Sequence, residues 1–126
     1  MLTVDKYSNI PIYEQIIDGI EKEILLGMLG EGSAIPSVRE LSMLLSINPN
    51  TIQRSFAELE RRGAICTIVG RGSFVREGAV ETIRLRMRGR LGELSALLQE
   101  LYVAGVAYDD IISETDKIYG KEKEEN

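Results

Sequence analysis

A short polar run at residues 48–54 carries the most distinctive chemistry of this sequence. It holds Asn50, Gln53 and Arg54 close together, and the first acidic residue after them is Glu58. An amide side chain can hydrogen-bond adenine through two atoms at once, and an arginine can do the same with guanine or contact a phosphate. These residue types at this spacing predict a surface that reads the base edges of DNA.

A helix that begins at Asn48-Pro49 would present this run. Asparagine is a favoured N-cap residue, and proline suits the first helical position because its missing N–H has no partner there. The pattern predicts a helix to about Arg62, ended by Gly63. Its inward face would consist of Ile52, Phe56 and Leu59.

The segments on either side complete a recognisable architecture. Residues 11–28 predict an amphipathic helix, a shorter helix follows Pro36, and β-branched residues around the Gly70-Arg71-Gly72 turn predict a β-hairpin over residues 64–75. The apolar positions of the two helices are Ile12, Ile16, Ile17, Ile20, Ile24 and Met28, then Val38, Leu41, Leu44 and Leu45. We therefore expect an α+β, mainly α chain with a winged helix-turn-helix of three helices and a hairpin wing.

The remaining residues predict a helical C-terminal unit. A helix is expected over residues 79–104, which Gly89 and Gly92 could bend, although residues 83–87 also alternate as a strand would. A last helix is expected to begin at Asp109 and to bury Ile111, Ile112, Thr115 and Ile118. A heptad-like apolar seam consists of Met87, Leu91, Leu94, Leu98 and Leu101. The seam could pack on the wing domain, but a chain of this size has little left to cover it, which favours a dimer interface.

Composition excludes several classes of protein. The chain has 126 residues, no His and a single cysteine, Cys66, so it lacks a disulfide framework, a Cys/His metal cage and a nucleophile-plus-base arrangement. We expect no enzyme activity, no metal and no cofactor. Cys66 is interpreted as a half-buried filler of the hairpin rather than a redox sensor. Without a signal-peptide pattern or a membrane span, a cytoplasmic location is expected.

Net charge is distributed unevenly along the chain. The formal charge is −5, yet residues 34–76 hold six arginines and three acidic residues, a net charge of +3. This is the segment that contains the polar run and the hairpin. Acidity elsewhere would limit indiscriminate DNA binding and leave selectivity to the positive segment.

The ordered motifs between residues 10 and 76 resemble the N-terminal domain of the GntR family of bacterial transcription regulators. The motifs are Pro11-Ile12-Tyr13-Glu14-Gln15-Ile16, the Gly27 to Leu41 segment with Ile35-Pro36-Ser37 and Arg39, Asn48-Pro49-Asn50-Thr51 with Glu58-Leu59-Glu60, and Gly70-Arg71-Gly72-Ser73-Phe74-Val75. The short remainder resembles the YtrA-type branch, which has a two-helix C-terminal dimerisation unit. The resemblance implies a DNA-binding domain over residues 1–77 and a helical dimerisation domain with a charged tail over residues 78–126.

The resemblance also implies a set of DNA-facing residues and a mode of action. It implies a homodimeric repressor on a palindromic operator, in a branch that often controls ABC-transporter operons, with no effector identified. The DNA-facing residues would be Arg39, Asn48, Asn50, Thr51, Gln53, Arg54, Gly70 and Arg71. One departure from the family pattern is Val69, which stands where the family often has a polar or basic residue.

Structural alternatives exist for several of these residues. Arg39 could instead pair with Glu40 or Glu58, and Asn48 has a complete role as an N-cap. Arg84, Arg86, Arg88 and Arg90 form either a solvated face paired with helix acids or a contact to the DNA backbone. The alternative for the whole chain is a winged-helix module that binds a protein partner and no operator.

Overall fold

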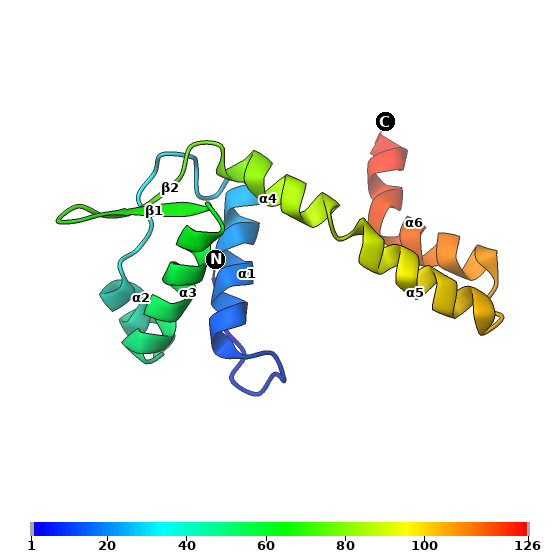
Figure 1. Cartoon of the computed structure of the whole chain (residues 1–126), viewed down its shortest axis with the longest axis horizontal. Coiled ribbons are helices and arrows are strands. Elements are labelled where there is room, and N and C mark those ends of the chain that lie inside the picture. The colour runs from blue at the N-terminus through cyan, green and yellow to red at the C-terminus, as the bar shows by residue number, and fades with distance from the viewer. Residues whose placement is uncertain (1, 126) are drawn as a thin grey trace. The chain divides into compact units, whose positions relative to one another are not determined.

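The computed structural model describes residues 2–125, with side chains described to residue 120. It forms two compact units, residues 1–87 and 88–126 (Figure 1). The elements in chain order are α1 (Ile12–Leu25), α2 (Val38–Leu45), α3 (Pro49–Arg61), β1 (Ile65–Ile68), β2 (Gly72–Val75), α4 (Ala79–Arg88), α5 (Leu91–Val103) and α6 (Tyr108–Glu125). Asn126 and the side chains of the predicted charged tail lie outside the described residues.

The core of the N-terminal unit lies where α1 packs on α3. The predicted inward face of α3 is confirmed, because Ile52 and Leu59 are fully buried and Phe56 is nearly so. Their partners on α1 are Ile16, Ile17, Ile20 and Ile24. Burying each such side chain stabilises the fold by about 1.5–3 kcal/mol. Met28 was expected on the same face, but it follows the end of α1 and is exposed.

Caps define both ends of α2 and the start of α3. Ser37 and Glu40 form a capping box at the start of α2, with the Glu40 N–H donating to Ser37 Oγ over 3.0 Å. Ser46 ends α2 in the left-handed conformation, with φ of 54°. Asn48 then caps α3 by accepting a 2.8 Å hydrogen bond from the Asn50 N–H. These local bonds set where the polar run of α3 begins.

The expected hairpin is present as an antiparallel β1–β2 pair. Its register runs from Ile65 opposite Val75 to Ile68 opposite Gly72. Gly70 and Gly72 adopt φ values of 81° and 103°, which other residues reach only with strain. The glycines therefore allow the tight tip of the wing.

The C-terminal helices differ from the expected single helix over residues 79–104. That prediction is wrong, because α4 ends at Arg88 and α5 starts after Arg90, with Gly89 between them. Glycine disfavours a helix interior, which explains the break at Gly89. The apolar seam nevertheless continues on both sides of this break. The strand alternative for residues 83–87 is also wrong, since the segment lies in α4. Ala79 and Ile83 of α4 are buried in the N-terminal core.

The second unit consists of α5 and α6, and most of its apolar side chains are not buried. None of the residues of α5 is buried. Ile118 was expected to be buried but is 79% exposed, and Ile112 is 38% exposed. Two helices alone cannot enclose a core, which is why these side chains remain in contact with solvent.

Candidate nucleic-acid interface

The exposed face of α3 displays the polar side chains that the sequence singled out. Asn50, Gln53 and Arg54 are exposed and Thr51 is half-buried. The opposite face is buried, and there Ser55 Oγ donates to the backbone carbonyl of Tyr13 over 2.9 Å. The first turn of α3 contains no acidic residue. The first turn of α3 can therefore present its amide and hydroxyl groups to a polyanion with no carboxylate among its own residues.

Asn48 performs the structural role that the sequence favoured. Its side-chain oxygen accepts from the Asn50 N–H, so that oxygen is engaged at the helix N-terminus. The residue is exposed, and its side-chain NH₂ donates no hydrogen bond to any residue between 2 and 120. The N-cap prediction is confirmed, and a contact to DNA stays a prediction.

Arg39 is an exposed residue in the first turn of α2. Both acidic partners considered for it are engaged elsewhere, because Glu40 completes the capping box and Glu58 binds Arg61 and Arg62. Within the described residues, Arg39 forms no ion pair. The pairing alternative is wrong, and the guanidinium keeps its hydrogen-bond donors for another partner.

The wing tip combines a cation with exposed apolar side chains. Gly70 and Arg71 are exposed, and the turn is closed by a 2.9 Å hydrogen bond from the Arg71 N–H to the Ile68 carbonyl. Val69 is 98% exposed and Ile68 is 45% exposed. Cys66, further down β1, is a free, half-buried cysteine as expected.

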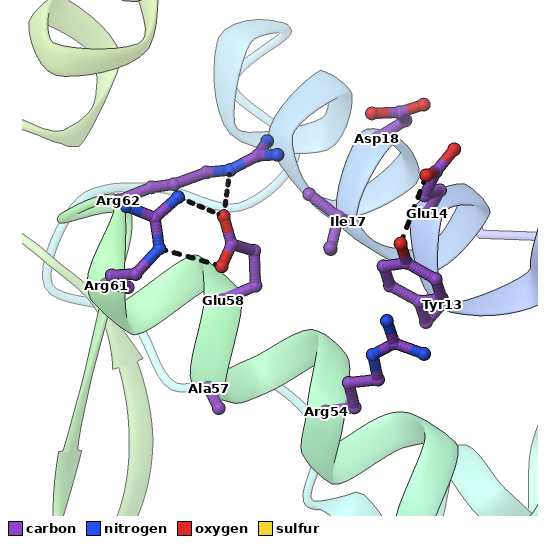
Figure 2. A pocket seen from close by; sticks show the side chains of 9 residues that line it. All are labelled: Tyr13, Glu14, Ile17, Asp18, Arg54, Ala57, Glu58, Arg61 and Arg62. Carbon is purple, nitrogen blue, oxygen red and sulfur yellow. Dashed lines mark hydrogen bonds and ion pairs between the residues drawn. The ribbon is translucent and has the colours of Figure 1, made fainter.

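A polar cavity of about 610 Å³ lies between α1 and α3 (Figure 2). Glu58 binds Arg61 and also accepts a 3.0 Å hydrogen bond from Arg62 Nε. These two guanidinium groups lower the pKa of Glu58 to about 2, because they stabilise its charged form. The Arg54 guanidinium lies 3.6 Å from the centre of the Tyr13 ring.

A second group of charges sits behind this cavity. Glu21 is 5% exposed, and its carboxylate accepts from Arg62 over 3.2 Å and from Arg86 over 2.6 and 2.7 Å. Partial desolvation, and after it the Glu21 charge, raise the pKa of the nearby Asp18 carboxyl. The paired arginines thus join α1 to the residue that follows α3 and to α4, and they hold α3 against α1.

Metal binding and membrane insertion find no support in the part of the chain that the structure describes. Between residues 2 and 125, no three His, Cys, Asp or Glu side chains converge in a way that could hold a metal ion. No helix in that part of the chain is both long and apolar enough to cross a membrane.

Known proteins share both the sequence and this geometry. Residues 12–75 match the family model described as bacterial regulatory proteins, gntR family. The HTH-type transcriptional repressor YtrA of Bacillus subtilis is 38% identical over 112 residues, which cover 88% of this chain and 86% of that protein.

The chain belongs to the GntR family of bacterial regulatory proteins. It is a DNA-binding transcriptional regulator of the YtrA type, and its family is one of regulators rather than enzymes. A GntR family regulator from Listeria monocytogenes has the same fold, with a TM-score of 0.72 and 34% identity over 90% of this chain and 98% of that one. The DNA-binding domain of AraR, solved in complex with operator ORX1, has a TM-score of 0.53 and 26% identity over 59% of this chain and 92% of that one.

The sequence did not predict the long-range contacts that hold α3 in place. Glu21 lies 41 residues from Arg62 and 65 from Arg86, so no local spacing marks the group. Of the four arginines left open above, Arg86 has this internal partner and Arg90 binds Glu93. Arg84 and Arg88 are exposed and, in the part of the chain described, carry no ion pair.

Proposed function

We propose that this GntR regulator is a cytoplasmic homodimer that represses transcription by binding a palindromic operator. Residues 1–77 would supply the DNA-binding surface and residues 78–126 the dimer contacts. The observation that carries the proposal is the exposed polar face of α3, whose first turn holds no acid, together with the exposed Arg39 on α2. The contacting residues would be Arg39, Asn48, Asn50, Thr51, Gln53, Arg54, Gly70 and Arg71.

The apolar surface of the second unit supports the dimer. The proposed seam is largely uncovered in the single chain, with Leu91 54% exposed, Leu94 49% and Leu98 36%. An apolar groove of about 460 Å³ between α5 and α6 continues this surface, and it is lined by Leu98, Leu101, Tyr102, Val106, Tyr108, Ile111, Ile112 and Thr115. Apolar patches of this kind mark interfaces, and a twofold dimer buries the same patch on both copies. Met87, Leu91, Leu94, Leu98 and Leu101 would form its centre.

The mode of regulation is proposed from relatives. The B. subtilis relative is named as a repressor, which supports repression here. The YtrA type also suggests an ABC-transporter operon, with the operator next to the gene of the regulator itself. A symmetric dimer would place two α3 helices in successive major grooves, which requires two half-sites related by a dyad.

The test is operator selection followed by substitution of the reading face. Genomic fragments retained by the purified protein should contain a palindrome, and affinity for it should fall steeply between low and moderate salt. Replacing Gln53 and Arg54 with alanine should abolish the preference for operator over random duplex, while the helical circular dichroism signal and the dimer persist. Replacing the exposed Glu60 on the same helix with glutamine is the matched control, and it should leave that preference intact.

Two outcomes would overturn the proposal. If the Gln53/Arg54 variant still prefers operator to random duplex as strongly as wild type does, α3 is not the element that recognises the operator sequence. A protein that retains no DNA fragment at any salt concentration would instead be a winged-helix module for a protein partner.

A further inference from the structure

Three arginines line the cavity between α1 and α3, and they differ in what their donors do. Arg61 and Arg62 direct their N–H groups at Glu58, and Arg62 also reaches Glu21. The Arg54 guanidinium instead lies over the Tyr13 ring (Figure 2). Among residues 2–120, none accepts a hydrogen bond from the Arg54 side chain. Two of the three arginines are therefore paired with carboxylates, and the third, Arg54, is stacked on an aromatic ring.

Stacking uses the face of the guanidinium and leaves its edge available. The N–H donors of arginine lie in the plane of the group, so a ring 3.6 Å from the guanidinium carbon does not occupy them. The contact does restrict a long side chain that otherwise has many rotamers. A side chain ordered before binding loses less conformational entropy when its partner arrives.

We propose that Tyr13 is a positioning residue for DNA reading, which holds Arg54 ready so that its free edge can bond a guanine or a phosphate. The inference rests on the proposed function, because it requires α3 to contact an operator. It assigns to α1 a part in recognition although α1 itself supplies no base contact. The tyrosine is well placed for this role, since its backbone carbonyl is tied to α3 by Ser55 Oγ.

The experiment measures operator and random-duplex affinity for four full-length proteins. They are wild type, Tyr13→Leu, Tyr13→Phe and Arg54→Ala. Leucine removes the ring while keeping an apolar side chain, and phenylalanine removes only the hydroxyl, which is hydrogen-bonded to Glu14 over 3.2 Å. We expect Tyr13→Leu to lower operator affinity about three- to ten-fold, the range that ordering one side chain supplies. Tyr13→Phe should bind as wild type does.

A double-substitution cycle separates positioning from independent contact. If Tyr13 acts through Arg54, adding Tyr13→Leu to Arg54→Ala should cause little further loss. Losses that multiply, or a Tyr13→Phe variant as weak as Tyr13→Leu, would overturn the inference, since Tyr13 would then touch DNA by itself. So would a Tyr13→Leu variant with wild-type affinity in a protein where Arg54→Ala weakens binding.

If the Tyr13→Leu variant does not fold, a measurement on the wild-type protein tests the inference instead. The Arg54 Nε–H proton should show an aromatic ring-current shift in the free protein, and it should keep this shift when operator is added. Loss of the shift on binding would mean that Arg54 leaves the ring to reach DNA, which overturns the inference. A wild-type protein without operator preference would instead be the failure of the proposed function.

Discussion

The two units of the chain differ in where they keep their apolar side chains. Within the described residues, every buried hydrophobic side chain lies between Ile16 and Ile83. Helix α5 buries none of its residues, and Leu94 and Leu97 are about half exposed. The N-terminal unit thus has a core of its own, whereas the second unit has an apolar surface that needs a cover. This difference predicts that the two units respond differently to substitution and to protein concentration.

The largest effect is expected from charging the seam. Replacing Leu94 and Leu98 with glutamate would place four carboxylates in the proposed dimer interface, so the proposed dimer should dissociate. Operator affinity should then fall by about a hundred-fold or more, because the second half-site contact is lost. Sedimentation velocity reports the oligomeric state. The control is Leu26→Glu, at a position that is 64% exposed in the first unit, and it should remain a dimer. A Leu94/Leu98 variant that sediments as a stable dimer would contradict the assignment of the interface.

The next effect tests whether the first unit has an independent core. Leu59→Ala removes a fully buried side chain and should lower the free energy of unfolding by about 2–5 kcal/mol. Because Leu59 is buried by side chains of its own unit, the loss measured by denaturant unfolding should be the same at low and high protein concentration. A loss that disappears at high concentration would mean that this core is also completed by a second copy.

A feature of the fold or of the site could be predicted from the sequence when the residues that produce it are close together in the chain. The N-cap at Asn48, the inward face of α3 and the hairpin turn at Gly70 are local, and the sequence predicted all three. At Gly89 the sequence predicted no more than a bend, because the apolar seam continues on both sides of it, whereas the helix ends at Arg88 and restarts at Leu91. The Tyr13–Arg54 stack and the Glu21 group were missed because their members come from separate elements. Local spacing carries no information about such pairs.

A smaller effect is expected at Glu21, the buried carboxylate that joins α1 to α4 within the first unit. Glu21→Gln keeps the shape but removes the charge that faces Arg62 and Arg86, whose side chains are 27% and 33% exposed. Since solvent screens both cations in part, the loss of unfolding free energy should be about 1–2 kcal/mol, less than for a fully buried pair. Thermal unfolding measures it, with the exposed Glu81→Gln as control. Equal melting temperatures for wild type and Glu21→Gln would show that the group contributes no net stability.

The smallest effect concerns Asp18 and has the opposite sign. Partial burial and the Glu21 charge raise the pKa of this carboxyl in the folded state, so the folded protein binds the proton more tightly than the unfolded chain does. Ionised Asp18 therefore costs stability at pH values above its folded pKa, and this cost vanishes below the ordinary value of 3.8. Asp18→Asn should be more stable than wild type at pH 7, by less than about 1 kcal/mol after solvent screening. Unfolding at pH 7 and near pH 3.5 checks the sign, because only the first condition should separate the two proteins; an equal difference at both would assign the effect to packing rather than charge.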